Sequence, residues 1–330
     1  MKVLVTGGGG FLGSRLARKL FDRGDDVTIL GRSAYPQFDE SIRCVQVDIR
    51  DQDALIRALE GQETVFHTVA IPGIWGSYND FYQTDVVGTD NVIAACRIQN
   101  VKKLIYTSSP SVVFGQGDLE GVDESAPYPK TYLCHYPKTK AMAEQQVMQA
   151  SGNKLATVCL RPHLIWGPGD PHLVPRLIER ARGNKLIRVG DGTNQVDMIY
   201  IDNAVEAHVQ ACDRLEPDGG IAGSCYFVSD GKPVVLWKWI DDVLKKLYLP
   251  PVERSVSFKT ATLLGALLEG IYGLLRVKKE PPMTRFLAAQ LATSHYFNIS
   301  RAQRDFGYNP VVSSKEGMDR LVEYFIRQAG

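Results

Sequence analysis

The chain has 330 residues, which is long for one hydrophobic core and sufficient for a nucleotide-binding domain plus a smaller second domain. Hydrophobic residues make up 44% and charged residues 23% of the sequence, the balance of a globular rather than a disordered protein. The formal net charge of +1 gives no electrostatic reason to expect a nucleic-acid partner.

The six cysteines form no Cys-x-x-Cys pair and are accompanied by no His-x-x-x-His, so we expect neither a metal site nor a redox dithiol. The sequence runs from Met1 almost directly into a glycine cluster, which leaves no room for a signal peptide. We therefore expect a cytoplasmic protein in a reducing compartment.

Short apolar runs alternate with helical patterns along the first half of the chain. Strands are expected at residues 2–6, 26–30, 43–47, 63–67, 102–107 and 155–160, and helices at 11–22, 53–59, 82–99 and 132–150. This alternation predicts the α/β class, with a doubly wound parallel sheet of the Rossmann type.

The first strand runs into the sequence Thr-Gly-Gly-Gly-Gly-Phe-Leu-Gly at 6–13, before the first helix. Glycines allow a tight turn and a close approach of the backbone to a pyrophosphate, which the helix N-terminus then stabilises. Two spacings fit, one with Gly7, Gly10 and Gly13 and one that starts at Gly8. A merely flexible loop is the alternative, but the strand before and the helix after favour dinucleotide binding.

The second strand is followed by Arg32 and Ser33, where NAD-binding domains usually carry a carboxylate that binds the ribose. Without that carboxylate, and with an arginine to bind a 2′-phosphate, the sequence favours NADP(H) as cofactor. The alternative is that Arg32 is an ordinary surface residue. Asp48 and Ile49, after the third strand, are placed to meet the adenine edge.

A Tyr-x-x-x-Lys pair, Tyr136 and Lys140, lies on the helix expected at 132–150, where residues four apart share a face. Ser109 follows the fifth strand, at the carboxyl edge where open α/β sheets bind ligands. Reduction of a carbonyl needs a proton donor and a second hydrogen bond to the oxygen, and a nearby cation lowers the pKa of a tyrosine. We predict that these three residues are catalytic and that Tyr136 and Lys140 also contact the cofactor, Lys140 by holding the nicotinamide ribose. A core tyrosine and a surface lysine are the alternative.

Glycine and proline become frequent after residue 166, beginning with Gly-Pro-Gly-Asp-Pro at 167–171. We predict an NADP-binding domain at 1–165 and a smaller, interleaved α/β substrate domain at 166–330, with a return segment at about 195–228 that rejoins the first domain. An apolar helix is expected at about 260–275; it is shorter than a membrane span and contains Glu269. A lid over an apolar pocket is favoured over an interfacial membrane helix.

The Thr-Gly-x-x-Gly-x-x-Gly loop, Tyr-x-x-x-Lys and Leu-Arg-Pro at 160–162 together resemble the extended short-chain dehydrogenases/reductases over essentially the whole chain. Val-Gly-Thr-Asp-Asn-Val-Ile at 87–93, the stretch at 106–114 and Glu-Pro-Pro-Met-Thr-Arg-Phe at 280–286 resemble the 3β-hydroxysteroid dehydrogenase branch. Ile-Trp-Gly-Ser-Tyr at 74–78 and Leu-Ile-Trp-Gly-Pro-Gly-Asp at 164–170 are similar to bacterial reductases of long-chain olefin biosynthesis.

This resemblance implies reduction of the 3-oxo group of a 2-alkyl-3-oxo long-chain fatty acid by NADPH, with Tyr136 as proton donor. It also implies that the cofactor lies along Phe11, Leu12, Ala70, Pro162 and Ile165. A hydrophobic substrate, a homodimer through helices near 82–99 and 132–150, an assembly with other enzymes of the pathway and peripheral membrane contact are compatible with it.

Relatives commonly carry asparagine where this chain has Asp85, so the role of that position is open. The alternative functions are a 3β-hydroxysteroid or sterol-4-carboxylate 3-dehydrogenase and, in another class, a sensor that binds NADP(H) without catalysis. Such sensors lose the tyrosine or the lysine, whereas this chain keeps both.

Overall fold

The computed structural model describes residues 1–35, 38, 41–71, 73–115 and 117–329. Its centre is a seven-stranded sheet in which every neighbouring pair is parallel. The spatial order is β12 (Ser224–Val228), β7 (Ala156–Pro162), β5 (Lys103–Thr107), β4 (Thr64–His67), β1 (Lys2–Thr6), β2 (Asp26–Gly31) and β3 (Arg43–Gln46). This order, with β1 in the middle, confirms the doubly wound fold predicted from the sequence.

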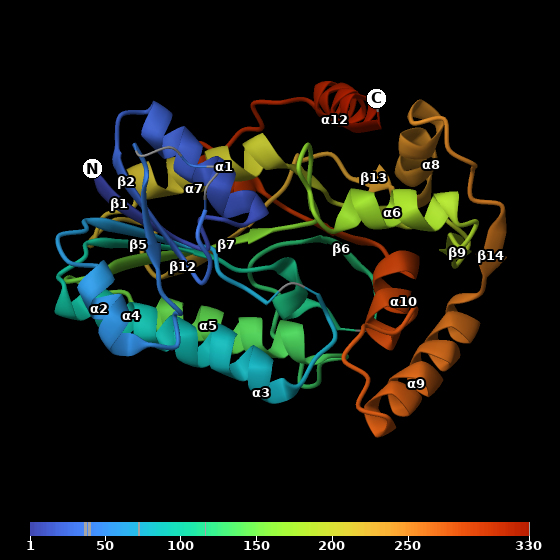
Figure 1. Cartoon of the computed structure of the whole chain (residues 1–330), viewed down its shortest axis with the longest axis horizontal. Coiled ribbons are helices and arrows are strands. Elements are labelled where there is room, and N and C mark those ends of the chain that lie inside the picture. The colour runs from blue at the N-terminus through green and yellow to red at the C-terminus, as the bar shows by residue number, and fades with distance from the viewer. Residues whose placement is uncertain (36–37, 39–40, 72, 116, 330) are drawn as a thin grey trace.

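Helices cover both faces of the large sheet (Figure 1). One face carries α1 (Phe11–Asp22) and α7 (Ile201–Arg214), which pack on each other; the other carries α2 (Gln52–Ala58), α4 (Gly88–Ile98) and α5 (His135–Ala150). Because both faces are covered, the strands are almost wholly apolar; in β1, for example, Val3, Leu4 and Val5 are fully buried.

The second half of the chain builds smaller units at one end of the sheet, the right side of Figure 1. A four-stranded sheet contains β13 (Val234–Val235), β10 (Gln195–Val196), β15 (His295–Phe297) and β6 (Leu119–Val122). Two strand pairs join β8 (Ile165–Trp166) to β11 (Ile199–Tyr200) and β9 (Ile187–Val189) to β14 (Arg254–Val256). The helices here are α6 (Leu173–Arg182), α8 (Leu236–Lys246), α9 (Phe258–Leu274), α10 (Arg285–Ala292), α11 (Ser300–Phe306) and α12 (Ser314–Ala329).

The chain returns from these smaller units to the large sheet through α7 and β12, and β12 pairs with β7 at the sheet edge. The six strands expected from the sequence are present with ends shifted by at most two residues, and β12 is the seventh. The division into two domains near residue 166 stays a prediction.

The helix expected at 82–99 is present, but it is not α-helical throughout. The structure has α3 (Tyr78–Phe81), then a π-helical turn (Tyr82–Val87), and only then α4. The wider π turn places Asp85 and Val86 in the interior, and such turns are frequent at functional sites.

Candidate active site

The glycine loop closes tightly between β1 and α1. Gly7 has a φ of +71°, a left-handed conformation that favours glycine, and a Cβ on Gly13 would lie 2.2 Å from the Gly7 carbonyl oxygen. Gly10 is the N-cap of α1 and makes no side-chain cap, so the first amides of the helix are open to an anion. These features fit the pyrophosphate of a dinucleotide. A Cβ on Gly8 would lie 2.4 Å from the Ile29 side chain, so both glycine spacings are compatible with the turn.

The aromatic ring of Tyr35, which the sequence analysis did not single out, lies against this loop. A Cβ on Gly9 would come within 1.8 Å of a ring carbon, and one on Gly31 within 1.8 Å of the hydroxyl oxygen. The ring therefore covers the region between the glycine loop and the end of β2. Only glycine at positions 9 and 31 leaves room for the Tyr35 ring. In the sequence, the glycine at the end of the second strand, together with the glycine loop, could have indicated that a bulky side chain packs there.

The residues predicted to select the cofactor lie beside this region. Arg32 and Ser33 are exposed after β2, and the Arg32 carbonyl accepts a hydrogen bond from Gln46. Asp48 forms an ion pair with Arg50 at 2.6 Å, and this contact is the main cause of its lowered pKa. The Arg32 guanidinium, directly after β2, also lowers the pKa of Asp48 through its charge.

The other predicted cofactor contacts differ in exposure. Ala70 is exposed just after β4, Ile165 is half-buried in β8, and Pro162 is buried at the end of β7. The Ile49 side chain is buried against Gly88, where an added Cβ would lie 2.5 Å from it. Phe11 and Leu12 open α1 directly after the glycine loop.

Ser109 and Tyr136 are brought together by two different elements. Ser109 follows β5 and caps a short 3-10 helix, where its Oγ accepts a hydrogen bond from the Ser111 amide at 3.2 Å. Tyr136 lies in the first turn of α5, with its phenol close enough to the Ser109 hydroxyl for that hydroxyl to lower the pKa of Tyr136. The structure therefore joins two residues that are 27 positions apart in the sequence.

Burial raises the pKa of Tyr136 to about 12, although the hydrogen bond from Ser109 acts in the opposite direction. The expectation that Lys140 lowers this pKa is wrong for this structure. The physical reason is that desolvation of the phenolate dominates. The phenol is thus held in its protonated form at neutral pH.

Lys140 is almost fully buried, and its Nζ lies 2.7 Å from both the Tyr106 hydroxyl and the Thr107 carbonyl oxygen. The ammonium also lies 4.2 Å from the centre of the Tyr106 ring. Burial lowers the pKa of Lys140 to about 8, partly offset by the charge of Asp85. Tyr106 was missed in the sequence because it reads as an ordinary buried strand residue.

Asp85 projects from the π turn into this buried network. Its Oδ2 accepts a 2.7 Å hydrogen bond from Thr139, the residue before Lys140, whereas its Oδ1 has no partner among the described residues. Burial raises the pKa of Asp85, and Lys140 and Thr139 act against this. The Asp85 carboxylate thus accepts a hydrogen bond from α5.

Two further polar pairs behind the site are structural. Arg161 of β7 and Glu144 of α5 form a buried bidentate ion pair at 2.7 and 2.9 Å. His163 Nε2 and His295 Nδ1 lie 2.6 Å apart, and burial lowers the pKa of both rings. In the described part of the chain, no group of three or more His, Cys, Asp or Glu side chains is arranged to hold a metal ion.

Taken together, the parallel sheet, the glycine loop and the Ser109, Tyr136 and Lys140 side chains define an oxidoreductase of the short-chain dehydrogenase/reductase type, dependent on a nicotinamide dinucleotide. The model of the 3-beta hydroxysteroid dehydrogenase/isomerase family matches residues 4–259, and the chain belongs to this family.

The chain is 48% identical to the 2-alkyl-3-oxoalkanoate reductase of Stenotrophomonas maltophilia, over 97% of this chain and 98% of that protein. It is 33% identical to the sterol-4-alpha-carboxylate 3-dehydrogenase, decarboxylating, of Mus musculus, over 98% of this chain and 91% of that protein. Among solved structures, MoeE5 in complex with UDP-glucuronic acid and NAD has the same fold, with a TM-score of 0.77 and 24% identity over 99% of this chain and 100% of that one.

Proposed function

We propose that the chain reduces the 3-oxo group of a 2-alkyl-3-oxo long-chain fatty acid to the 2-alkyl-3-hydroxy acid, with NADPH as cofactor. The observation that carries the proposal is the proximity of the Ser109 hydroxyl to the phenol of Tyr136, which is half-buried and protonated, in a chain 48% identical to a 2-alkyl-3-oxoalkanoate reductase. A bound nicotinamide cofactor supplies the hydride. The residues of this chain bind the substrate oxygen and give it a proton.

Tyr136 donates its proton to the carbonyl oxygen as negative charge develops there, and Ser109 donates a second hydrogen bond to the same oxygen. A phenol with a pKa raised to about 12 keeps its proton at neutral pH and can donate it to the substrate oxygen. Lys140 keeps a cation beneath this site, anchored by Tyr106 and the Thr107 carbonyl, and we assign it to binding the nicotinamide ribose.

The preference for NADP(H) over NAD(H) rests on Arg32. Replacing Arg32 with alanine is expected to raise KM for NADPH by roughly 10- to 100-fold, because a charge-assisted bond to a phosphate is worth about 1.5–3 kcal/mol. KM for NADH should stay within about threefold. Steady-state kinetics with both cofactors measure these KM values. The matched control is Arg43→Ala, because Arg43 is an exposed arginine at the start of β3, whereas the end of β3 pairs with the end of β2 that precedes Arg32. Equal losses with both cofactors would contradict the assignment.

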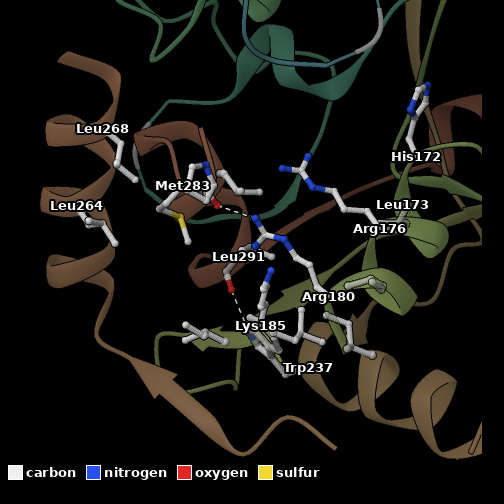
Figure 2. Close-up of a pocket in the computed structure, with 16 residues that line it drawn as sticks. His172, Leu173, Arg176, Arg180, Lys185, Trp237, Leu264, Leu268, Met283 and Leu291 are labelled. Atoms are coloured by element: carbon white, nitrogen blue, oxygen red, sulfur yellow. Dashed lines mark hydrogen bonds between the residues drawn. The ribbon is translucent and has the colours of Figure 1, made fainter. Parts of the chain in front are cut away.

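The long chains of the substrate fit an apolar pocket between α6, α8, α9 and α10, with a volume of about 560 Å³ (Figure 2). Leu264 and Leu268 of α9 face into it, opposite Trp237 of α8. The lining also includes Leu173, Leu177, Ile240, Met283, Leu287 and Leu291. None of the three proposed catalytic residues lines it, so we assign it to the distal part of an alkyl chain.

Replacing Leu268 with tryptophan is expected to fill part of this pocket. Loss of contact with about two methylene groups at about 0.8 kcal/mol each lowers kcat/KM for a long-chain substrate by roughly tenfold and leaves a short-chain analogue unaffected. The matched control is Leu267→Trp, the neighbouring residue, which is exposed on the outer side of α9. A chain-length profile that is the same in both variants would show that the pocket does not hold the alkyl chain.

The reaction is tested most directly in reverse, by the absorbance of NADPH formed from NADP⁺ and a 2-alkyl-3-hydroxy long-chain acid, because 3-oxo acids lose CO₂ spontaneously. A 3β-hydroxysteroid carboxylate is the second substrate, since a relative at 33% identity is a sterol-4-alpha-carboxylate 3-dehydrogenase. Turnover of the steroid alone would support the proposed mechanism but contradict the proposed substrate. Binding of NADP⁺ without turnover of either compound would favour the alternative of a sensor that binds NADP(H) without catalysis. A homodimer through α4 and α5 stays a prediction.

A further inference from the structure

Helix α9 presents an apolar face to solvent, and this face is not the one that lines the pocket. Its outer residues are exposed by 73% (Leu263), 60% (Leu267), 42% (Ile271), 84% (Leu274) and 67% (Leu275). They recur every three or four positions, so they form one stripe along the helix. Apolar side chains this exposed and this contiguous mark an interaction surface.

The other side of α9 is fixed to the protein. Ala261 is fully buried, and Gly265 packs so closely on the start of α10 that an added Cβ would lie 2.6 Å from the Thr284 carbonyl carbon. Leu264 and Leu268 turn toward the pocket (Figure 2). In Figure 1, α9 lies at the outer corner of the molecule with α10 on its inner side, so its outer face is accessible.

The charges around the exposed stripe are basic at both ends. Lys259 lies in the first turn, and Arg276, Lys278 and Lys279 follow the last turn; all four are exposed and none forms an ion pair with a described residue. The one acidic residue of the helix, Glu269, is neutralised by Arg285 at 2.7 Å. An apolar stripe with cations at its ends complements a lipid surface that carries negative headgroups.

A second copy of the chain fits this face poorly. In a twofold dimer with antiparallel α9 helices, the Lys259 end of one helix would meet the Arg276–Lys279 end of the other. No exposed carboxylate of α9 is available to compensate this repulsion. In the described part of the chain no helix is long and apolar enough to cross a membrane, so insertion would be shallow and parallel to the surface.

We propose that α9 docks this protein on an anionic bilayer, with the outer leucines between the lipid headgroups. The inner leucines of the same helix line the apolar pocket, so a lipid-derived substrate passes from the bilayer to the pocket around one helix. The docking surface stands on exposure and charge alone. The delivery of substrate rests on the proposed function.

The test is flotation of the full chain with vesicles of phosphatidylcholine alone and of phosphatidylcholine with 30 mol% phosphatidylglycerol (about one anionic lipid in three). We expect binding to the anionic vesicles only, weakened at high salt. The double variant Leu267→Glu with Leu274→Glu should lower the affinity for anionic vesicles at least tenfold. The double variant Lys259→Glu with Lys278→Glu should lower this affinity about fivefold for each lysine replaced. Val311→Glu, at an exposed apolar residue elsewhere, should have no effect.

Turnover of a short, water-soluble substrate should be unchanged in all these variants, which separates docking from catalysis. A wild-type protein that turns over substrate but does not float with anionic vesicles overturns the docking proposal alone. Sedimentation that shows a dimer dissociated by Leu267→Glu would overturn it in favour of a second copy. A protein that floats as expected but turns over no substrate overturns the proposed function and leaves the docking surface intact.

Discussion

Replacing Tyr136 with phenylalanine is expected to lower kcat/KM for the 2-alkyl-3-oxo acid by roughly 10³-fold, because the carbonyl oxygen loses its proton donor. Ser109 keeps its hydrogen bond to the Ser111 amide, so the oxygen-binding position stays formed. The dissociation constant for NADPH should change by less than about threefold, since the variant removes one hydroxyl and no part of the glycine loop. Stopped-flow oxidation of NADPH and fluorescence titration measure the two quantities.

Tyr132→Phe is the matched control, because Tyr132 lies four residues before Tyr136, in the loop that leads into α5, and its hydroxyl donates to the Val112 carbonyl at 3.0 Å. That variant should retain kcat/KM within about threefold, with a loss in stability of about 1 kcal/mol for the missing hydrogen bond. Similar losses of activity in both variants would mean that the region responds to packing and that Tyr136 is not the proton donor.

The fold is largely predictable from the sequence because its signals are local. The glycine cluster between an apolar run and a helical pattern fixes the first βαβ unit, and six of the seven strands follow from alternation. The π turn is not predictable in this way. Its residues continue the helical pattern, and only burial of Asp85 against α5 shows why the backbone widens there.

The three proposed catalytic residues are also visible in the sequence, but their electrostatics are not. Tyr-x-x-x-Lys spacing suggests that the cation acts on the phenol, whereas in the structure Lys140 Nζ bonds to Tyr106 and Thr107 and burial dominates the pKa of Tyr136. Desolvation depends on how many elements close over a side chain, and β5, the π turn and α5 all contribute here. No pattern within one element carries that information.

The segment at 260–275 shows a different limit. Its residues are apolar on nearly every side of the helix. The helical periodicity therefore cannot distinguish a face that packs on the protein from a face that is exposed to solvent or lipid. In the structure Leu264 and Leu268 line the pocket, with Leu264 still 45% exposed, whereas Leu263 and Leu267 are 73% and 60% exposed. The lid and the membrane-facing helix both stay predictions, the first based on the pocket-lining residues and the second on the exposed ones.

Glu144→Ala is expected to destabilise the protein by about 3–5 kcal/mol, because it leaves the buried Arg161 guanidinium without its carboxylate. Arg161 lies 4.9 Å from the centre of the Phe227 ring, and its Nη1 already has no partner among the described residues. The Tyr128 hydroxyl, which donates to Glu144, is neutral and cannot supply the compensating charge. Urea unfolding measures the loss. Glu216→Ala, which removes an exposed pair with Lys103, should cost less than about 1 kcal/mol.

The double variant Glu144→Met with Arg161→Met separates stability from placement of the active site. Apolar side chains of similar length remove the stranded charge, so most of the lost stability should return. The ion pair, however, joins α5, which carries Tyr136 and Lys140, to β7. If the pair sets the position of α5, the double variant regains its free energy of unfolding but keeps a kcat lowered by roughly tenfold, as expected when reacting groups are held less well. Full recovery of kcat would show that packing alone positions α5 and that the ion pair has no role in catalysis.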